Sequence, residues 1–286
     1  MIFIDGLGIG EDDHRDNPLA RYPDIWPRKG CPPDRHDLGY TALDACLSVE
    51  GLPQSATGQT SLLTGENAAR LLGKHLQGFP SRRLVEILKQ KSIFIQLKRY
   101  GLKVTFANAY RHPEDVRSTS RLSVTSHALR ACGEAFRSIE QLPRGQALYH
   151  DFTNRSLRDR GYDAPLFTPE QAGDILIRIA RQHDFTLYEH FLTDVVAHQG
   201  DGEAITRQVD ELYRFVKTVL DRINPMDMMV IITSDHGNIE DLSVKTHTLN
   251  PVPLLWLGPS YLEVQPLPKD ITGVTPWVLR LLKCRG

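Results

Sequence analysis

Acidic and imidazole side chains fall at the ends of predicted strands, or in the loop before the next one, at four places in the sequence. They are Asp5, Asp194, His198, Asp235, His236 and His247. Ligands of an open parallel sheet gather at the carboxyl ends of its strands, so we expect these side chains to converge there. Such a mixed set of oxygen and nitrogen donors suits Zn²⁺ or Mn²⁺ and fits Ca²⁺ poorly. Six candidates exceed the need of one tetrahedral ion and predict two ions about 3.5–4 Å apart, an arrangement that supports in-line displacement at phosphorus.

Each of these residues also has an ordinary structural interpretation. Asp5 after a strand is typical of a turn former or a helix cap. Asp235 and His236, followed by a glycine and an asparagine, could form a turn, and His198 and His247 could be satisfied loop histidines. The joint placement of all six at one predicted edge of the sheet favours the metal site.

A second candidate is the run of small and hydroxyl residues from Gln54 to Gly65, which leads into a predicted helix. Free amide N–H groups and the positive end of the helix dipole would meet an anion there. A hydroxyl beside a metal can be deprotonated near neutral pH and become a nucleophile. The alternative is an ordinary Ser or Thr N-cap. On chemistry alone, Thr57 and Thr60 remain rivals of Ser55.

Strands and helices alternate along the chain, which indicates an α/β fold with a mainly parallel sheet and helices on both faces. The expected strands are residues 2–4, 102–107, 185–192, 229–233 and 253–257, and the expected helices are residues 41–48, 84–100, 124–139, 169–182, 203–223 and 275–282. Residues 1–286 are expected to form a single catalytic domain, with residues 111–163 as a lid-like insertion. His183 and Asp184 precede a strand and should lie at the opposite edge of the sheet.

Composition narrows the class of protein. The 286 residues are 41% hydrophobic and carry a formal net charge of -1, which gives no global attraction to nucleic acid or to anionic membranes. No apolar run approaches the roughly 20 residues of a membrane span, and no signal peptide is expected. The four cysteines are scattered, which favours reduced thiols and a cytoplasmic location.

Five segments in order resemble the alkaline phosphatase superfamily, most closely its cofactor-independent phosphoglycerate mutase branch. They are residues 4–8, 55–65, 193–201, 234–240 and 246–253. The resemblance implies that Asp194, His198 and His247 hold one ion and that Asp5, Asp235 and His236 hold the other, with Ser55 between them. In this family the nucleophile lies ten positions before a glycine. Counting back from Gly65 selects Ser55, which implies a phosphoserine intermediate.

The sequence departs from the mutases because it lacks their large cap domain. A mutase must exclude water from its phosphoryl group, so the missing cap favours hydrolysis over isomerisation. The predicted function is a two-metal phosphoester hydrolase, either a phosphatase or a phosphodiesterase. The alternatives are a small phosphomutase with residues 111–163 as its lid, and a metal-stabilised binding protein without turnover. The segment after Ser55 lacks the arginine of the superfamily's sulfatases, which disfavours that activity.

The expected partner is a small phosphorylated substrate, bound by a monomer or a homodimer. Candidate substrate contacts are Lys74, His75, Asn108 and Arg121, with Arg82, Arg83 and Arg111 as further basic groups near the predicted mouth. For each basic group the alternative is a solvated surface charge.

Overall fold

A six-stranded sheet forms the centre of the protein in the computed structural model, which describes residues 1–113, 116, 122–259 and 265–283. The strand order is β2-β8-β7-β1-β6-β3. The strands are β1 (Ile2–Ile4), β2 (Gly39–Leu43), β3 (Val104–Phe106), β6 (Phe185–His190), β7 (Val230–Thr233) and β8 (Val252–Leu257). Strands β7, β1, β6 and β3 pair in parallel, whereas β8 is antiparallel to both β7 and β2. The predicted α/β fold with a mainly parallel sheet is confirmed.

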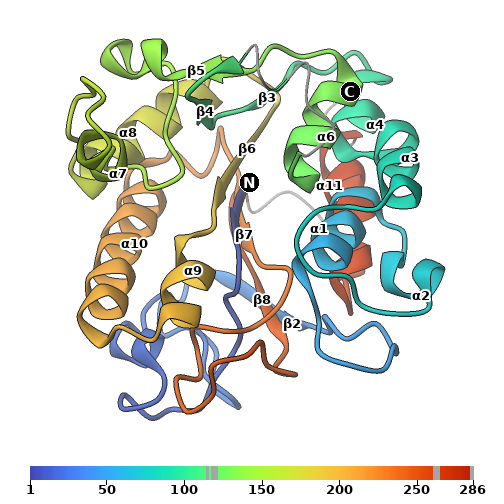
Figure 1. Ribbon diagram of the computed structural model, residues 1–286, viewed down its shortest axis with the longest axis vertical. Coiled ribbons are helices and arrows are strands. Elements are labelled where there is room, and N and C mark those ends of the chain that lie inside the picture. The colour runs from blue at the N-terminus through green and yellow to red at the C-terminus, as the bar shows by residue number, and fades with distance from the viewer. Residues whose placement is uncertain (114–115, 117–121, 260–264, 284–286) are drawn as a thin grey trace.

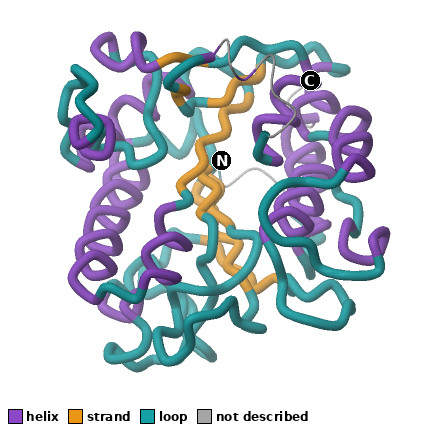
Figure 2. The backbone as a smooth tube through the Cα atoms, in the orientation of Figure 1, coloured by secondary structure: helices purple, strands orange, loops and turns teal. Residues whose placement is uncertain are grey.

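Helices cover both faces of the sheet (Figures 1 and 2). One face carries α8 (Pro169–Ala180) and α10 (Gly202–Arg222). The other carries α1 (Ser55–Thr64), α3 (Arg82–Lys91), α4 (Ile93–Lys98), α6 (Val124–Cys132) and α11 (Val274–Lys283). Successive side chains of β1 alternate between the two resulting cores, because Ile2 and Ile4 pack with the α8 and α10 side and Phe3 with the other. A strand buried on both faces reads as a continuous apolar run.

Shorter elements complete the described structure. They are the helices α2 (Ala68–Leu72), α7 (Arg155–Asp159) and α9 (Leu192–Gln199), 3₁₀ turns at Pro18–Arg21, Ile139–Arg144 and Ile271–Gly273, and the two-residue strands β4 (Ala109–Tyr110) and β5 (Arg137–Ser138). No helix in the described ranges has the length and apolar character needed to cross a bilayer.

Local capping explains where helix α8 begins. The Thr168 side chain accepts from the Gln171 amide and the Gln171 side chain accepts from the Thr168 amide, so the pair forms a capping box, and Pro169 occupies the first turn. Asp201 caps α10 in a similar way by accepting from the amides of Glu203 and Ala204.

Four expected boundaries are wrong. Residues 41–48, expected to be helical, are not: residues 41–43 belong to strand β2, which is held in antiparallel register with β8, and residues 45–48 form bends and turns. The helix expected over residues 84–100 is interrupted at Ser92, whose extended backbone ends α3 and begins α4. The helix expected to reach residue 139 stops at Cys132, because Gly133 adopts a positive φ of 76°. The strand expected to reach residue 192 ends at His190, and α9 follows it.

The segment 111–163 contains α6, β5 and α7 within the described residues. A small apolar cluster of its own includes Leu142, Tyr149 and Leu157. The segment therefore has packed structure beside the main sheet, and its role as a lid stays a prediction.

Candidate metal centre

The first group of candidate ligands is Asp194, His198 and His247. Asp194 and His198 lie one turn apart on α9, so the segment expected to be a loop is a helix that places both side chains on one face. Asp194 Oδ1 lies 3.5 Å from His198 Nε2 and 3.4 Å from His247 Nε2. The two histidine Nε2 atoms are 3.1 Å apart. The three ligand atoms thus surround one small space.

The second group is Asp5, Asp235 and His236, and all three residues are buried. Asp5 follows β1 and the other two follow β7, so parallel neighbours in the sheet bring them together. His236 Nε2 lies 3.2 Å from Asp5 Oδ1 and 3.5 Å from Asp235 Oδ2. Both of these carboxylate oxygens are buried and have no hydrogen-bond partner among the described residues. Buried polar atoms are normally satisfied, so the pair points to an absent partner such as a cation.

The two groups are adjacent, and a hydroxyl lies beside them. The rings of His236 and His247 stack with centroids 3.8 Å apart and an interplanar angle of 17°. Ser55 Oγ, at the first residue of α1, lies 3.1 Å from His236 Nε2. The structure therefore brings the six predicted ligands and the predicted nucleophile together, as the sequence analysis expected of a two-metal site.

The histidines are oriented as cation ligands would be. Each directs Nδ1 at a backbone carbonyl oxygen, at 3.2 Å for His198 and Lys245, 2.7 Å for His247 and Pro53, and 3.4 Å for His236 and Gly237. A carbonyl only accepts, so Nδ1 carries the proton and a neutral ring keeps the Nε2 lone pair. With both rings neutral, two such lone pairs would face each other between His198 and His247 at 3.1 Å, and a cation there would accept both. The donor set fits divalent metal ions.

The electrostatics of the metal-free groups point the same way. Burial opposes a positive charge on His236, but the carboxylates of Asp235, Asp5 and Asp194 outweigh it and raise the pKa of His236 to about 10. Burial and the charge of Asp5 raise the pKa of Asp235 well above its usual range. Burial also disfavours ionised Asp194, yet the hydrogen bond with His247 and the charge of His236 lower its pKa to about 2. Without metal, the group of Asp5, Asp235 and His236 therefore retains a proton, which a bound cation would displace.

Hydrogen bonding separates Ser55 from its rivals. Thr57 Oγ1 donates to the Gln54 carbonyl and accepts from the Leu76 amide, and Thr60 Oγ1 donates to the Ala56 carbonyl. Both hydroxyls are thus engaged with backbone. The N-cap of α1, Gln54, makes no side-chain capping bond, and the Thr57 amide donates to the Leu76 carbonyl, so the amides of Ser55 and Ala56 keep their capacity to bind an anion.

Sequence reasoning assigned no role to Glu240, a buried carboxylate beneath the metal-ligand loops. Its Oε2 accepts from the amides of Gly8 and Asn238, and its Oε1 accepts from Thr248 Oγ1 and Asn250 Nδ2. A Cβ at Gly8 would lie 2.3 Å from Glu240 Oε1, so only glycine permits this approach. The residue lay within the segment 234–240, but only the fold reveals its four donors.

Glu240 ties together the three loops that carry Asp5, the pair Asp235 and His236, and His247. Glu240→Ala should therefore weaken metal binding by about 10- to 100-fold, the usual cost of losing an outer partner of the ligands. Titration of the chelator-treated protein with Mn²⁺ or Zn²⁺ measures this change. Glu86→Ala is the matched control, because Glu86 is an exposed partner of Lys89. Equal affinities in wild type and the Glu240 variant would contradict this role.

The predicted substrate contacts are less clearly placed. Lys74 is exposed, and His75 Nε2 lies 3.3 Å from the Val49 carbonyl in a segment that flanks the start of α1. Asn108 is buried, and both ends of its amide bond the backbone of Glu189. Its geometry supports a structural role in joining β3 to β6. Arg121 lies outside the described residues. None of these side chains is seen in contact with the two ligand groups in the part of the chain that the structure describes.

Glu189, at the end of β6, is a second acidic residue that the sequence analysis did not single out. Burial raises its pKa to about 7, against the hydrogen bond from Thr125 Oγ1 and with a further contribution from the charge of Asp5. Its usual value is 4.5. The folded state therefore holds the proton more tightly than the unfolded chain, and stability is lost as pH rises through this window.

The consequence is measurable in chelator-treated protein. Relative to Glu189→Gln, which keeps an oxygen for Thr125, the wild type should lose on the order of 3 kcal/mol of unfolding free energy between about pH 4 and about pH 8. Urea denaturation across this pH range measures the difference. Parallel pH dependence in the two proteins would show that Glu189 ionises normally.

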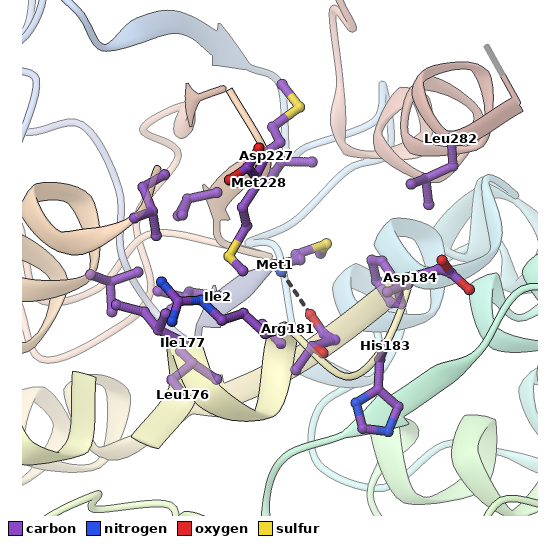
Figure 3. Close-up of a pocket in the computed structure, with 18 of the residues that line it drawn as sticks. Met1, Ile2, Leu176, Ile177, Arg181, His183, Asp184, Asp227, Met228 and Leu282 are labelled. Atoms are coloured by element: carbon purple, nitrogen blue, oxygen red, sulfur yellow. Dashed lines mark hydrogen bonds between the residues drawn. The ribbon is translucent and has the colours of Figure 1, made fainter. Parts of the chain in front are cut away.

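A large apolar cavity of about 480 Å³ lies at the opposite edge of the sheet. Its lining includes Met1, Leu176, His183 and Asp184 (Figure 3). His183 and Asp184 therefore lie where the sequence predicted them, at the start of β6 and away from the two ligand groups. The convergent acidic and imidazole groups, rather than the size of a pocket, locate the candidate active site.

Comparison with known proteins agrees with the resemblance seen in the sequence. Residues 165–272 match the model of the Metalloenzyme superfamily. The 2,3-bisphosphoglycerate-independent phosphoglycerate mutase of Pseudomonas fluorescens is 30% identical over 122 residues, covering 40% of this chain and 24% of the mutase. The same enzyme of Clostridioides difficile is 30% identical over 108 residues, covering 35% and 21%. The matches thus span about a quarter of these relatives.

Solved structures share the fold over almost the whole chain. A protein from Pyrococcus horikoshii is similar with a TM-score of 0.59 and 15% identity, covering 99% of this chain and 95% of that one. The alkaline phosphatase of the Antarctic bacterium TAB5 gives 0.57 and 13%, covering 99% and 97%. Residues 165–272 are therefore similar to the Metalloenzyme superfamily, and the chain has an alkaline phosphatase-like fold.

Proposed function

We propose that this chain is a metal-dependent phosphoester hydrolase that acts on a small phosphorylated substrate through a phosphoserine intermediate on Ser55. The observation that carries the proposal is the position of Ser55 Oγ, 3.1 Å from Nε2 of His236, whose ring stacks on His247 of the first ligand group. A hydroxyl at an uncapped helix start next to six convergent ligands suits phosphoryl transfer and has no evident structural purpose.

The side chains and amides around Ser55 have separate roles in the proposed reaction. Two divalent ions, of manganese or zinc, held by Asp194, His198, His247 and by Asp5, Asp235, His236, would supply the positive charge that activates a hydroxyl and neutralises phosphoryl oxygens. The amides of Ser55 and Ala56, at the start of α1, are placed to bind a phosphoryl oxygen. Gln59 and Asn238 hold Asp5 and Asp194 in place through hydrogen bonds of 3.0 and 2.7 Å.

The proposed reaction has two displacements. Ser55 Oγ gives up its proton as the Oγ–P bond forms and the bond between phosphorus and the ester oxygen breaks, and the departing oxygen takes up a proton in its place. Water then attacks phosphorus and breaks the Oγ–P bond, which releases phosphate and restores the serine hydroxyl. Metal-dependent activity on aryl phosphates and on their diesters tests the proposal. The ratio of kcat/KM for the monoester to kcat/KM for the diester distinguishes a phosphatase from a phosphodiesterase. Phosphate release that stops with chelator and returns with Mn²⁺ or Zn²⁺ is the expected result.

A phosphomutase is the second candidate, because the sequence relatives found are phosphoglycerate mutases. Conversion of one phosphoglycerate isomer to the other without release of phosphate would favour it over hydrolysis. No turnover of any phosphoester with either metal, together with tight binding of a partner protein, would overturn both proposals and favour a metal-stabilised binding protein.

A further inference from the structure

A second cavity, of about 590 Å³, opens at the sheet edge that carries the candidate metal centre. Leu192 and Val195 line it from α9, the helix whose Asp194 and His198 belong to the first ligand group. Glu189 lines it from β6, where it pairs with Phe3, two residues before Asp5. The cavity thus adjoins the helix and the strand that position candidate ligands, although neither Ser55 nor any of the six ligand residues lines it.

One wall of the cavity is flat and aromatic. The rings of His150 and Phe191 stack with centroids 4.4 Å apart, and Tyr149 lies 4.1 Å from His150. Burial, followed by the charges of Arg160 and Arg111, lowers the pKa of His150 to about 3, so this ring is neutral. Neutral stacked rings favour contact with another apolar or aromatic group.

Two arginines supply the charge of the cavity. Arg111 and Arg160 both line it, and both act on His150 and on Tyr149, which places the two guanidinium groups near the same wall. Neither makes a salt bridge among the residues that the structure describes. Glu189 is the one carboxyl group of the described lining, and its proton affinity is raised by burial. Among the described residues, the lining therefore carries more positive than negative charge, which favours an acidic ligand group.

We propose that this cavity binds the leaving group of the phosphoester and selects one with an aromatic or apolar body and a second acidic group, held by Arg111 and Arg160. The inference rests on the proposed function, because it assumes that the phosphoryl group lies at Ser55. It also gives the segment 111–163 a role, since Arg111, Tyr149, His150 and Arg160 all come from it or border it.

The test compares 4-carboxyphenyl phosphate with phenyl phosphate, which differ only in the second acid. In the metal-loaded protein we expect a higher kcat/KM for the carboxylated ester. Arg160→Gln and Arg111→Gln should each reduce the ratio of the two kcat/KM values by about tenfold or more, through KM, because a charged hydrogen bond to the carboxylate is lost. Arg158→Gln is the matched control, since Arg158 pairs with Asp163 and does not line the cavity.

A binding experiment separates this inference from the proposed function. Calorimetry with the metal-loaded Ser55→Ala variant should show tighter binding of the carboxylated ester, and adding Arg160→Gln should remove the preference. Discrimination in binding without any turnover in the wild type would overturn the hydrolase and keep the cavity. Turnover with a ratio that neither arginine variant changes would overturn the cavity and keep the hydrolase.

Discussion

Ser55→Ala should abolish turnover and leave both candidate metal sites intact. The side chain is half-buried, and its hydroxyl contacts His236 rather than the backbone, so its removal costs the fold little. Loss of the attacking oxygen should lower kcat by roughly a factor of 10³ or more. Steady-state kinetics on an aryl phosphate, together with the metal content of the purified variant, measures both halves of the prediction.

Thr60→Val is the matched control for this experiment. Thr60 lies on the same helix, but its hydroxyl donates to the Ala56 carbonyl within the helix. Its variant should keep the wild-type rate. If turnover survives in Ser55→Ala and disappears in Thr60→Val, the nucleophile is not Ser55.

Loss of a single ligand should remove metal and the stability that metal provides. Asp235→Asn and His247→Ala each delete one donor from a different group, so each should weaken binding of at least one ion by more than about 100-fold. This loss exceeds the one expected for Glu240→Ala, because Glu240 only supports the loops that carry the ligands. A site held at 1,000 times its dissociation constant adds about 4 kcal/mol of stability, and a deleted ligand forfeits most of it. Thermal unfolding with metal and with chelator reports the difference between the two conditions.

Asp241→Asn provides the comparison, because Asp241 lies in the same loop and its side chain bonds only Ser243 among the described residues. Its variant should keep the full metal-dependent increase in Tm. Wild-type metal occupancy in both ligand variants would contradict the assignment of Asp235 and His247.

The sequence alone located the six candidate ligands because each follows a strand or borders one, and parallel strands end at one edge of a sheet. Ser55 emerged from its place before a helix and from its spacing to Gly65. The alternating elements predicted the fold class, since a long amphipathic helix such as residues 203–223 is recognised in the sequence by its period of 3.6 residues.

Other features depend on contacts that sequence spacing does not encode. Glu240 and Glu189 gain their roles from donors and neighbours far away in the chain, such as Gly8 and Asp5. Strand β2 was expected to be helical, because its strand conformation comes from pairing with β8 rather than from local preference. Arg160 lies just beyond a five-residue helix in a polar stretch, where nothing in the sequence distinguishes it from a surface charge.

Two cations should lie beside Ser55, one in each of the two groups of Asp and His side chains. Anomalous diffraction from crystals of the metal-loaded protein tests it most directly. We predict two peaks per chain, one among Asp194, His198 and His247 and the other among Asp5, Asp235 and His236. Metal bound elsewhere, or no peak at either group in the presence of saturating Mn²⁺ or Zn²⁺, would contradict the account.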